Sequence, residues 1–235
     1  MKKFFIILLL PLFFVSVSKA QNKNFDQQNA AAIKFGYHFY DNNDFEDKWG
    51  IDSSSICPEI SFEKKLTKKF SVEISGGFFS TETNYTYYIN SSSFINYNMD
   101  LKTYYLSPSI KYFLSKNNKF SLYLGLGPDF YHCVFKGKGF LNSKINTDFE
   151  DKHYIFGAHA LLGTEFIVYD NPSKHNYYNA PTGIFFEYKY TYANKGDFDK
   201  SPSDIFENLN PNINIDSKDL NAGGHTIFTG LRWHF

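Results

Sequence analysis

The seven histidines are the residues on which hydrolytic chemistry would depend, because imidazole is a common general base near neutral pH. They are His38, His132, His153, His159, His175, His225 and His234. A serine hydrolase places a histidine beside its serine and orients the imidazole with a carboxylate or an amide. No histidine here stands in a His-x-Ser pair, and the residue that follows His225 is Thr226 rather than a serine. We therefore predict that the protein has no catalytic residue.

Two acidic stretches are candidates for binding a divalent cation. Residues 41–47 read Asp-Asn-Asn-Asp-Phe-Glu-Asp. The last long connection contains Asp197, Asp199, Asp204, Asp216 and Asp219. The first stretch lacks the glycine and the distal glutamate of an EF-hand loop. We predict solvated loops with no specific metal and no cofactor, and cations that bridge these loops to lipopolysaccharide phosphates remain a hypothesis for a minor role.

A third group of charges lies within segments whose other residues alternate between apolar and small polar types. The group comprises Lys34, Glu63, Glu73, Lys111, Glu165, Glu187, Lys189 and Arg232. Burying an unpaired charge is expensive, whereas a compensated set of charges forms a rigid network. We predict that these eight residues pair with one another inside a closed sheet and fill its lumen.

Eight segments have the two-residue period that would position such side chains, since alternate residues of a strand point to opposite faces. They begin near Ile33, Ile56, Phe70, Leu101, Phe120, Phe156, Ile184 and Ile227. In the seventh, Ile184, Phe186 and Tyr188 alternate with Glu187 and Lys189. Each segment is about as long as a tilted strand that crosses a bilayer.

The connections between these segments alternate in length. Residues 64–69 and 115–119 are short turns, whereas residues 41–53, 80–100, 136–151 and 194–224 are long and rich in Asn, Asp, Ser and Tyr. The connection at 170–181 is longer than this alternation requires. Short turns at one end and long loops at the other are typical of outer-membrane barrels. We predict an all-β fold, an eight-stranded antiparallel up-and-down transmembrane β-barrel.

The amino-terminus has the three parts of a secretory signal peptide. Met1-Lys2-Lys3 is basic, residues 4–17 are apolar, and Ser18-Lys19-Ala20 forms a small-x-small cleavage site. The apolar run is shorter than the ~20 residues of a membrane-spanning helix, which disfavours an anchor. We predict a signal peptide at residues 1–20 and a barrel domain at residues 21–235.

The composition agrees with a barrel and argues against binding to nucleic acid. The chain has 27 Phe and 18 Tyr, which suit strands and aromatic girdles. Cleavage would remove Lys2, Lys3 and Lys19 from 24 basic residues, so 21 would remain against 24 acidic ones. Nucleic-acid binding depends on clustered basic residues. Cys57 and Cys133 lie on segments that are not neighbours, so we expect free or buried thiols rather than a disulfide.

The carboxy-terminal segment carries the strongest resemblance to a known family. Ile227, Thr229, Leu231, Trp233 and Phe235 share one face and resemble the closing strand of a bacterial outer-membrane barrel. Residues 104–113 and 124–128 resemble paired strands of the Bacteroidetes outer-membrane β-barrel domain, and the resemblance covers most of the mature chain. It implies residence in the cell outer membrane, contact with its lipid and lipopolysaccharide, and recognition of the terminal face by the barrel-assembly machinery. Pro108 and Pro128 depart from a regular ladder and are either bulges or ordinary irregularities.

The distribution of charge between the two faces decides between a membrane barrel and a soluble one. A soluble barrel carries solvating Lys and Glu at most outward positions, whereas here one face is continuously apolar. Eight strands enclose an interior that their own side chains fill, so we expect no open pore. We predict a non-enzymatic outer-membrane barrel with long extracellular loops and a structural, surface-interaction or secretion-associated role. The alternatives are a lipid A-modifying barrel enzyme and a soluble periplasmic lipocalin-like barrel.

Aromatic residues concentrate in one of the expected loops. Residues 84–88 read Asn-Tyr-Thr-Tyr-Tyr and residues 94–97 read Phe-Ile-Asn-Tyr. Tyrosine offers a rigid apolar ring and a hydrogen-bonding tip, which suits adhesive contact. The alternative is that these residues extend the strands past the membrane. The surface or secretion partner itself is not identified by the sequence.

Overall fold

Strands make up almost all of the chain that the computed structural model describes, which is residues 29–41, 54–90, 93–116, 119–141, 145–170, 181–197 and 219–235. They are β1 (Asn29–Tyr40), β2 (Ser54–Lys65), β3 (Phe70–Asn90), β4 (Ser93–Lys116), β5 (Phe120–Leu141), β6 (Ile145–Tyr169), β7 (Thr182–Ala193), β8 (Lys195–Asp197), β9 (Asp219–Asn221) and β10 (Gly224–His234). Within these ranges no helix is long and apolar enough to cross a membrane. The expected signal peptide and most of the connections at 41–53, 170–181 and 194–224 lie outside them.

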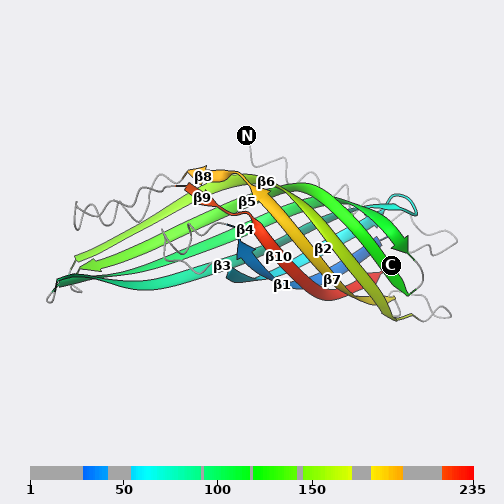
Figure 1. Ribbon diagram of the computed structural model, residues 1–235, viewed down its shortest axis with the longest axis horizontal. Coiled ribbons are helices and arrows are strands. Elements are labelled where there is room, and N and C mark those ends of the chain that lie inside the picture. Colours follow the sequence, from blue (N-terminus) through cyan, green and yellow to red (C-terminus); the bar gives the residue numbers. More distant parts are fainter. Residues whose placement is uncertain are drawn as a thin grey trace.

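Eight strands close a barrel in the order β1-β10-β7-β6-β5-β4-β3-β2, while β8 and β9 form a separate two-stranded sheet (Figure 1). Every barrel pair is antiparallel, and chain neighbours lie side by side. The last strand meets the first through Asn29 and Phe235, whose backbone groups exchange hydrogen bonds of 3.0 and 2.9 Å. The predicted fold class is therefore confirmed.

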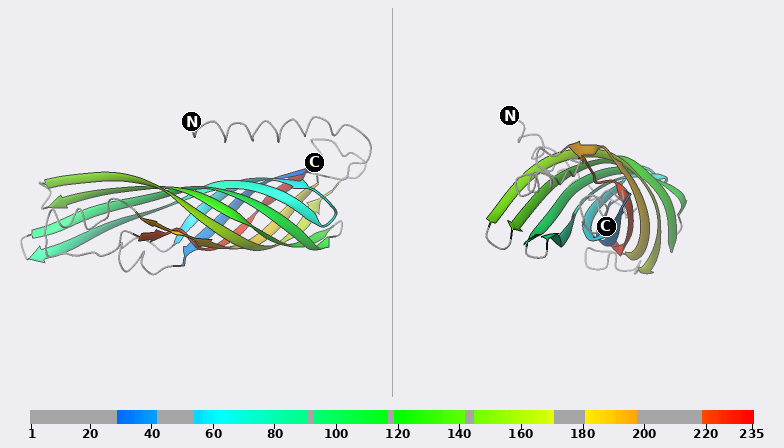
Figure 2. Two further views of the ribbon diagram at one scale, coloured as in Figure 1. Left: turned by 90° about the horizontal axis from the view of Figure 1, so that it is seen from above. Right: turned by 60° about the vertical axis from the view of Figure 1, so that its left-hand side comes forward.

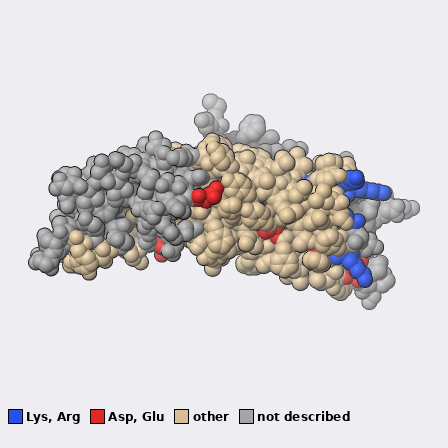
Figure 3. All heavy atoms as spheres, in the orientation of Figure 1, with Lys and Arg blue, Asp and Glu red and all other residues tan. Residues whose placement is uncertain are grey.

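The exterior of the barrel is apolar around its whole circumference. One large side chain per strand illustrates this, each at least half exposed: Phe35, Ile60, Phe78, Ile110, Leu126, Phe156, Phe186 and Ile227. Figure 3 shows a broad surface without Lys or Arg over the middle of the barrel, with these cations gathered at one end. Since the charged strand residues face inward instead, the two faces are arranged as in a membrane-spanning barrel and not as in a lipocalin.

Strands β3 to β6 continue well past the other four barrel strands (Figure 2). Residues 80–90, 93–102, 134–141 and 145–152 pair in register through Tyr85↔Tyr97 and Lys138↔Asp148, and we call this four-stranded sheet the extension. The prediction of long loops at 80–100 and 136–151 is therefore wrong. For residues 84–88 and 94–97 the structure shows the stated alternative, in which they continue the strands. Their Asn and Ser content suggested loops, but alternating Tyr, Thr and Phe find cross-strand partners in a hairpin.

Pro108 and Pro128 do not form bulges. Leu106 pairs with Phe130 and Ile110 with Leu126, so the β4–β5 register is the same on both sides of a gap in the ladder. The register shift between these strands lies instead at Phe113/Ser115. Two prolines near one another leave amide donors missing, and the ladder opens without inserting a residue.

Gly127 is required where the ladder opens, because a Cβ there would overlap the carbonyl oxygen of Pro108. We expect Gly127→Ala to destabilise the barrel by about 1–3 kcal/mol, since a backbone oxygen cannot move aside as a side chain can. A folded barrel runs faster on a gel before boiling than after it. The urea concentration at which half of this faster band is lost would measure the destabilisation. Gly76→Ala is the matched control, because its added Cβ would lie 3.4 Å from the nearest atom. Equal midpoints for the two variants would contradict the argument.

Candidate functional site: a sealed network of charges in the lumen

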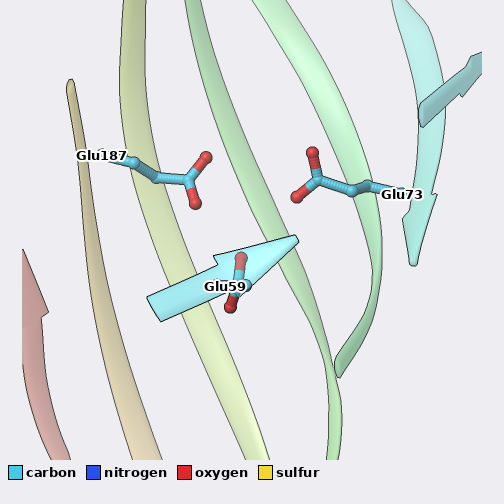
Figure 4. Close-up of side chains that lie close together, drawn as sticks. All are labelled: Glu59, Glu73 and Glu187. Atoms are coloured by element: carbon cyan, nitrogen blue, oxygen red, sulfur yellow. The ribbon is translucent and has the colours of Figure 1, made fainter. Parts of the chain in front are cut away.

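Three glutamates surround one lysine at the centre of the lumen. The Lys34 Nζ on β1 lies 2.8 Å from Glu59, 2.9 Å from Glu73 and 3.0 Å from Glu187, and all four residues are buried. Figure 4 shows the three carboxylates pointing toward one another from β2, β3 and β7. Their oxygens lie within 4.8 Å of each other, a spacing that could hold a metal ion. The ammonium of Lys34 already supplies the cation, so the cluster is an internal ion cage.

Lys111 on β4 connects two of these carboxylates from the other side. Its Nζ lies 2.7 Å from Glu73 and 3.3 Å from Glu187, and 4.7 Å from the centre of the Tyr123 ring. The Tyr123 hydroxyl donates a hydrogen bond of 3.1 Å to Glu187. Each carboxylate therefore satisfies several oxygen lone pairs, which is the condition under which buried ion pairs are tolerated.

Arg232 on β10 extends the network toward the end of the barrel that holds the short turns. Its guanidinium lies 3.1 Å from Glu165, 3.4 Å from Glu73 and 3.7 Å from Glu63. The imidazole of His234 lies 2.5 Å from the other oxygen of Glu165. The network thus spans strands on opposite walls and ties them across the lumen.

A second cluster is built on Asp129, nearer the extension. Its Oδ1 atom lies 2.9 Å from the Nζ of Lys189 and 3.0 Å from the Nδ1 of His159, and it accepts a hydrogen bond from Ser107. The Nε2 of His159 lies 2.8 Å from the hydroxyl of Ser109. Serine, imidazole and carboxylate therefore occur in the order of a hydrolase triad.

The environment of these three residues argues against hydrolysis. Ser109 is 5% exposed, His159 4% and Asp129 0%, so no substrate can approach the serine. Asp129 is also bound by Lys189 and Ser107, which makes it a junction of the lumen rather than a dedicated partner of His159. We expect a fluorophosphonate probe to leave Ser109 of the folded protein unlabelled, as judged by mass spectrometry. Labelling that disappears in Ser109→Ala would support the hydrolase alternative.

An aromatic layer covers the lumen on the side of the extension. Tyr105 lies 6.0 Å from Tyr131 and from Phe79, measured between ring centres, and Phe79 stacks on His38 at 4.6 Å. The two cysteines belong to this layer as buried free thiols, and the Cys57 sulfur lies 3.1 Å from the Tyr105 hydroxyl. Phe113, Tyr123 and Leu161 form a second apolar cluster, whose Tyr123 hydroxyl reaches Glu187 within the network. The aromatic layer thus covers the charges on the side of the extension, and the charged side chains themselves are buried.

All eight charged residues predicted to face inward are buried in the lumen. Seven belong to the central network, and Lys189 belongs to the cluster on Asp129. Sequence reasoning did not single out Glu59, Asp129, His159 or His234 as members. Glu59 is four residues before Glu63 in the same strand and so faces the same side, which could have revealed it. Asp129 directly follows Pro128, where the sequence does not establish that the strand stays regular.

The residues of the expected assembly signal line the outside of the seam. Ile227, Thr229 and Leu231 are exposed, and Trp233 and Phe235 are half-buried on the same outward side. His225 lies at the other end of β10, where its imidazole contacts the Tyr188 hydroxyl at 2.5 Å and Asp41 at 3.5 Å. It therefore forms a polar contact at the rim.

The fold and its charged, sealed interior define an eight-stranded transmembrane β-barrel. Neither family models nor curated proteins match the sequence. Similar solved structures include Neisserial surface protein A, at 14% identity over 91% of this chain and 100% of that one, TM-score 0.48. The attachment invasion locus protein of Yersinia pestis has 16% identity over 88% and 99%, TM-score 0.41. The Escherichia coli outer membrane protease OmpT has 10% identity over 92% and 99%, TM-score 0.38.

Proposed function

We propose that this protein is a non-enzymatic outer-membrane barrel that holds the extension outside the cell as a surface for interaction. The observation that carries this proposal is the contrast between a lumen filled by buried charges and rings and a sheet that continues past the apolar exterior of the barrel. A filled lumen serves as a rigid support, because its ion pairs connect strands on opposite walls. The part of the protein left to meet a partner is the extension.

The position of the termini supports an outward-facing extension. Asn29 and Phe235 lie at the barrel end that holds the turns after β2 and β4, opposite the extension. In outer-membrane barrels the short turns face the periplasm. The barrel-assembly machinery would then meet the terminal strand on the periplasmic side, and lipid and lipopolysaccharide would surround the belt.

The outward face changes character where the barrel becomes the extension. Tyr104, His132 and Tyr154 form an aromatic row, with ring centres 6.5 and 4.7 Å apart. Beyond it Glu150 is paired with Lys152 at 2.7 Å and Lys136 at 3.0 Å. Hydrogen bonds from Lys152 and then Lys136 lower the pKa of Glu150 to about 2, so the group stays ionised in any physiological medium. Aromatic and then charged residues mark the transition from lipid to water.

The topology can be tested with single cysteines, because Cys57 and Cys133 are buried and give little background. We expect Lys138→Cys in the extension to react with a membrane-impermeant maleimide on intact cells. Lys68→Cys in the turn after β2 is the control and should react only after the outer membrane is permeabilised. The reverse pattern, or loss of both proteins to the soluble periplasmic fraction, would overturn the proposal.

A further inference from the structure

A shallow polar pocket lies on the outward face of the extension. It has a volume of about 330 Å³ and is lined by Asn84, Thr86, Asn96, Asn98 and Phe140. The register explains the grouping, since Asn84 pairs with Asn98, Thr86 with Asn96, and Asn96 with Phe140. These residues therefore occupy two adjacent cross-strand rows on β3, β4 and β5, and their side chains lie on one surface.

The lining side chains can both donate and accept hydrogen bonds, and none of them is charged. Each asparagine offers an amide oxygen as acceptor and an NH₂ group with two donors. The Thr86 hydroxyl donates to the Asn96 amide oxygen at 2.7 Å, which fixes the orientation of that amide. Asn84 and Asn98 are exposed, and within the described ranges their amides make no side-chain hydrogen bond. Two amides are thus free to bind a ligand.

The same lining narrows the class of ligand. An acyl chain would leave the amides unsatisfied, and an ionised ligand would find no charged side chain in the lining to pair with. Of the nearby cations, Lys136 and Lys152 are already paired with Glu150. Lys138, beside Asn98, lies opposite the exposed Asp148 in the register, so the surroundings of the pocket carry charges of both signs. A neutral sugar fits, because its hydroxyl groups donate and accept, and its C–H face can lie on the half-buried ring of Phe140. The volume is near the lower end of ligand pockets, about 300–1,000 Å³, and suits one or two sugar rings.

We propose that this pocket binds a neutral pyranose unit of a glycan at the cell surface. The inference rests on the proposed orientation, which places the pocket just beyond the ion-paired band of Lys136, Glu150 and Lys152. At this position the sugar could belong to a glycolipid of the surrounding leaflet or to a soluble polysaccharide. Both sources present the same hydroxyl chemistry to Asn84 and Asn98.

The test uses the full barrel in phosphatidylcholine nanodiscs. The probes are an array of neutral glycans and the polysaccharide released by mild acid from the lipopolysaccharide of cells that make the protein. We expect binding that weakens at least about tenfold in Asn84→Ala/Asn98→Ala, since two hydrogen bonds are lost, and that also weakens in Phe140→Leu. Asn194→Ala, which removes an exposed amide directly after β7 and outside the pocket lining, is the matched control and should bind as wild type.

The outcomes distinguish a glycolipid from a soluble glycan as the source of the sugar. They also distinguish failure of the glycan site from failure of the proposed outward orientation. If intact lipopolysaccharide in the nanodiscs prevents binding of the soluble probe, the pocket binds the glycolipid of its own leaflet. If the soluble probe still binds, the ligand is a soluble glycan. No binding to any probe, or equal binding by wild type and both pocket variants, overturns the glycan site. The cysteine topology experiment is independent, so the outward orientation can hold even if the glycan site fails.

Discussion

Replacing Lys34 by methionine is expected to destabilise the barrel by about 3–5 kcal/mol, because the substitution leaves buried carboxylates without their central cation. Glu59, Glu73 and Glu187 each lie within 3.0 Å of the Lys34 ammonium. Methionine has a similar length and little effect on strand pairing, so the change reports mainly on charge. The urea midpoint of the unboiled, faster-migrating band would measure the loss.

Two further variants make this result specific. Lys102→Met removes an exposed ion pair with Asp100, at 2.8 Å, and should cost no more than about 1 kcal/mol. Adding Glu187→Gln to Lys34→Met removes one of the uncompensated carboxylates and should recover part of the loss. A Lys34→Met barrel as stable as the Lys102→Met barrel would show that the cage does not hold the lumen together.

The excess of carboxylates in the lumen makes this prediction stronger. Among the described residues, six acidic side chains, Glu59, Glu63, Glu73, Asp129, Glu165 and Glu187, are buried with four basic ones, Lys34, Lys111, Lys189 and Arg232. His159 and His234 each contact one of the carboxylates. No cation is therefore in surplus, and losing any one leaves negative charge that a neighbouring lysine or arginine cannot balance.

The strands and the inward or outward direction of their side chains could be predicted, because both follow from the alternation of neighbouring residues in the sequence. In β7, the alternation of Ile184, Phe186 and Tyr188 with Glu187 and Lys189 is enough to assign an outer and an inner face. Pairing across the lumen is not local in this way. Lys34 and Glu187 are 153 residues apart, so their contact follows only after the barrel has closed in the correct register.

The extension was predicted as loops, with continued strands only as the alternative for residues 84–97, for a related reason. Residues 84–98 contain Asn and Ser that are typical of loops, and their strand character depends on partners across the hairpin and on β5. The position of Asp129 is a second case in which local sequence is not enough. Its inward direction depends on whether the strand stays regular through Pro128, and the register shows that it does.

A barrel shortened at register-matched positions should retain its stability and lose its surface interaction. Asn84 pairs with Asn98 and Lys138 with Asp148, so residues 84–98 and 138–148 can each be replaced by an Asn-Gly turn. Every charged residue of the lumen lies outside the removed segments, as does the aromatic layer. We therefore expect the free energy of unfolding, obtained from a urea titration, to change by no more than about 1 kcal/mol.

The shortened barrel should no longer adhere to surfaces or bind glycan, because the polar pocket and most of the exposed part of the extension are gone. Cell adhesion and glycan binding would be compared with wild type after equal surface expression is verified by maleimide labelling of Lys102→Cys. Failure of the shortened barrel to assemble would mean that the extension belongs to the folding unit. Normal assembly with undiminished adhesion would move the interaction surface away from the extension, to another exposed part of the protein.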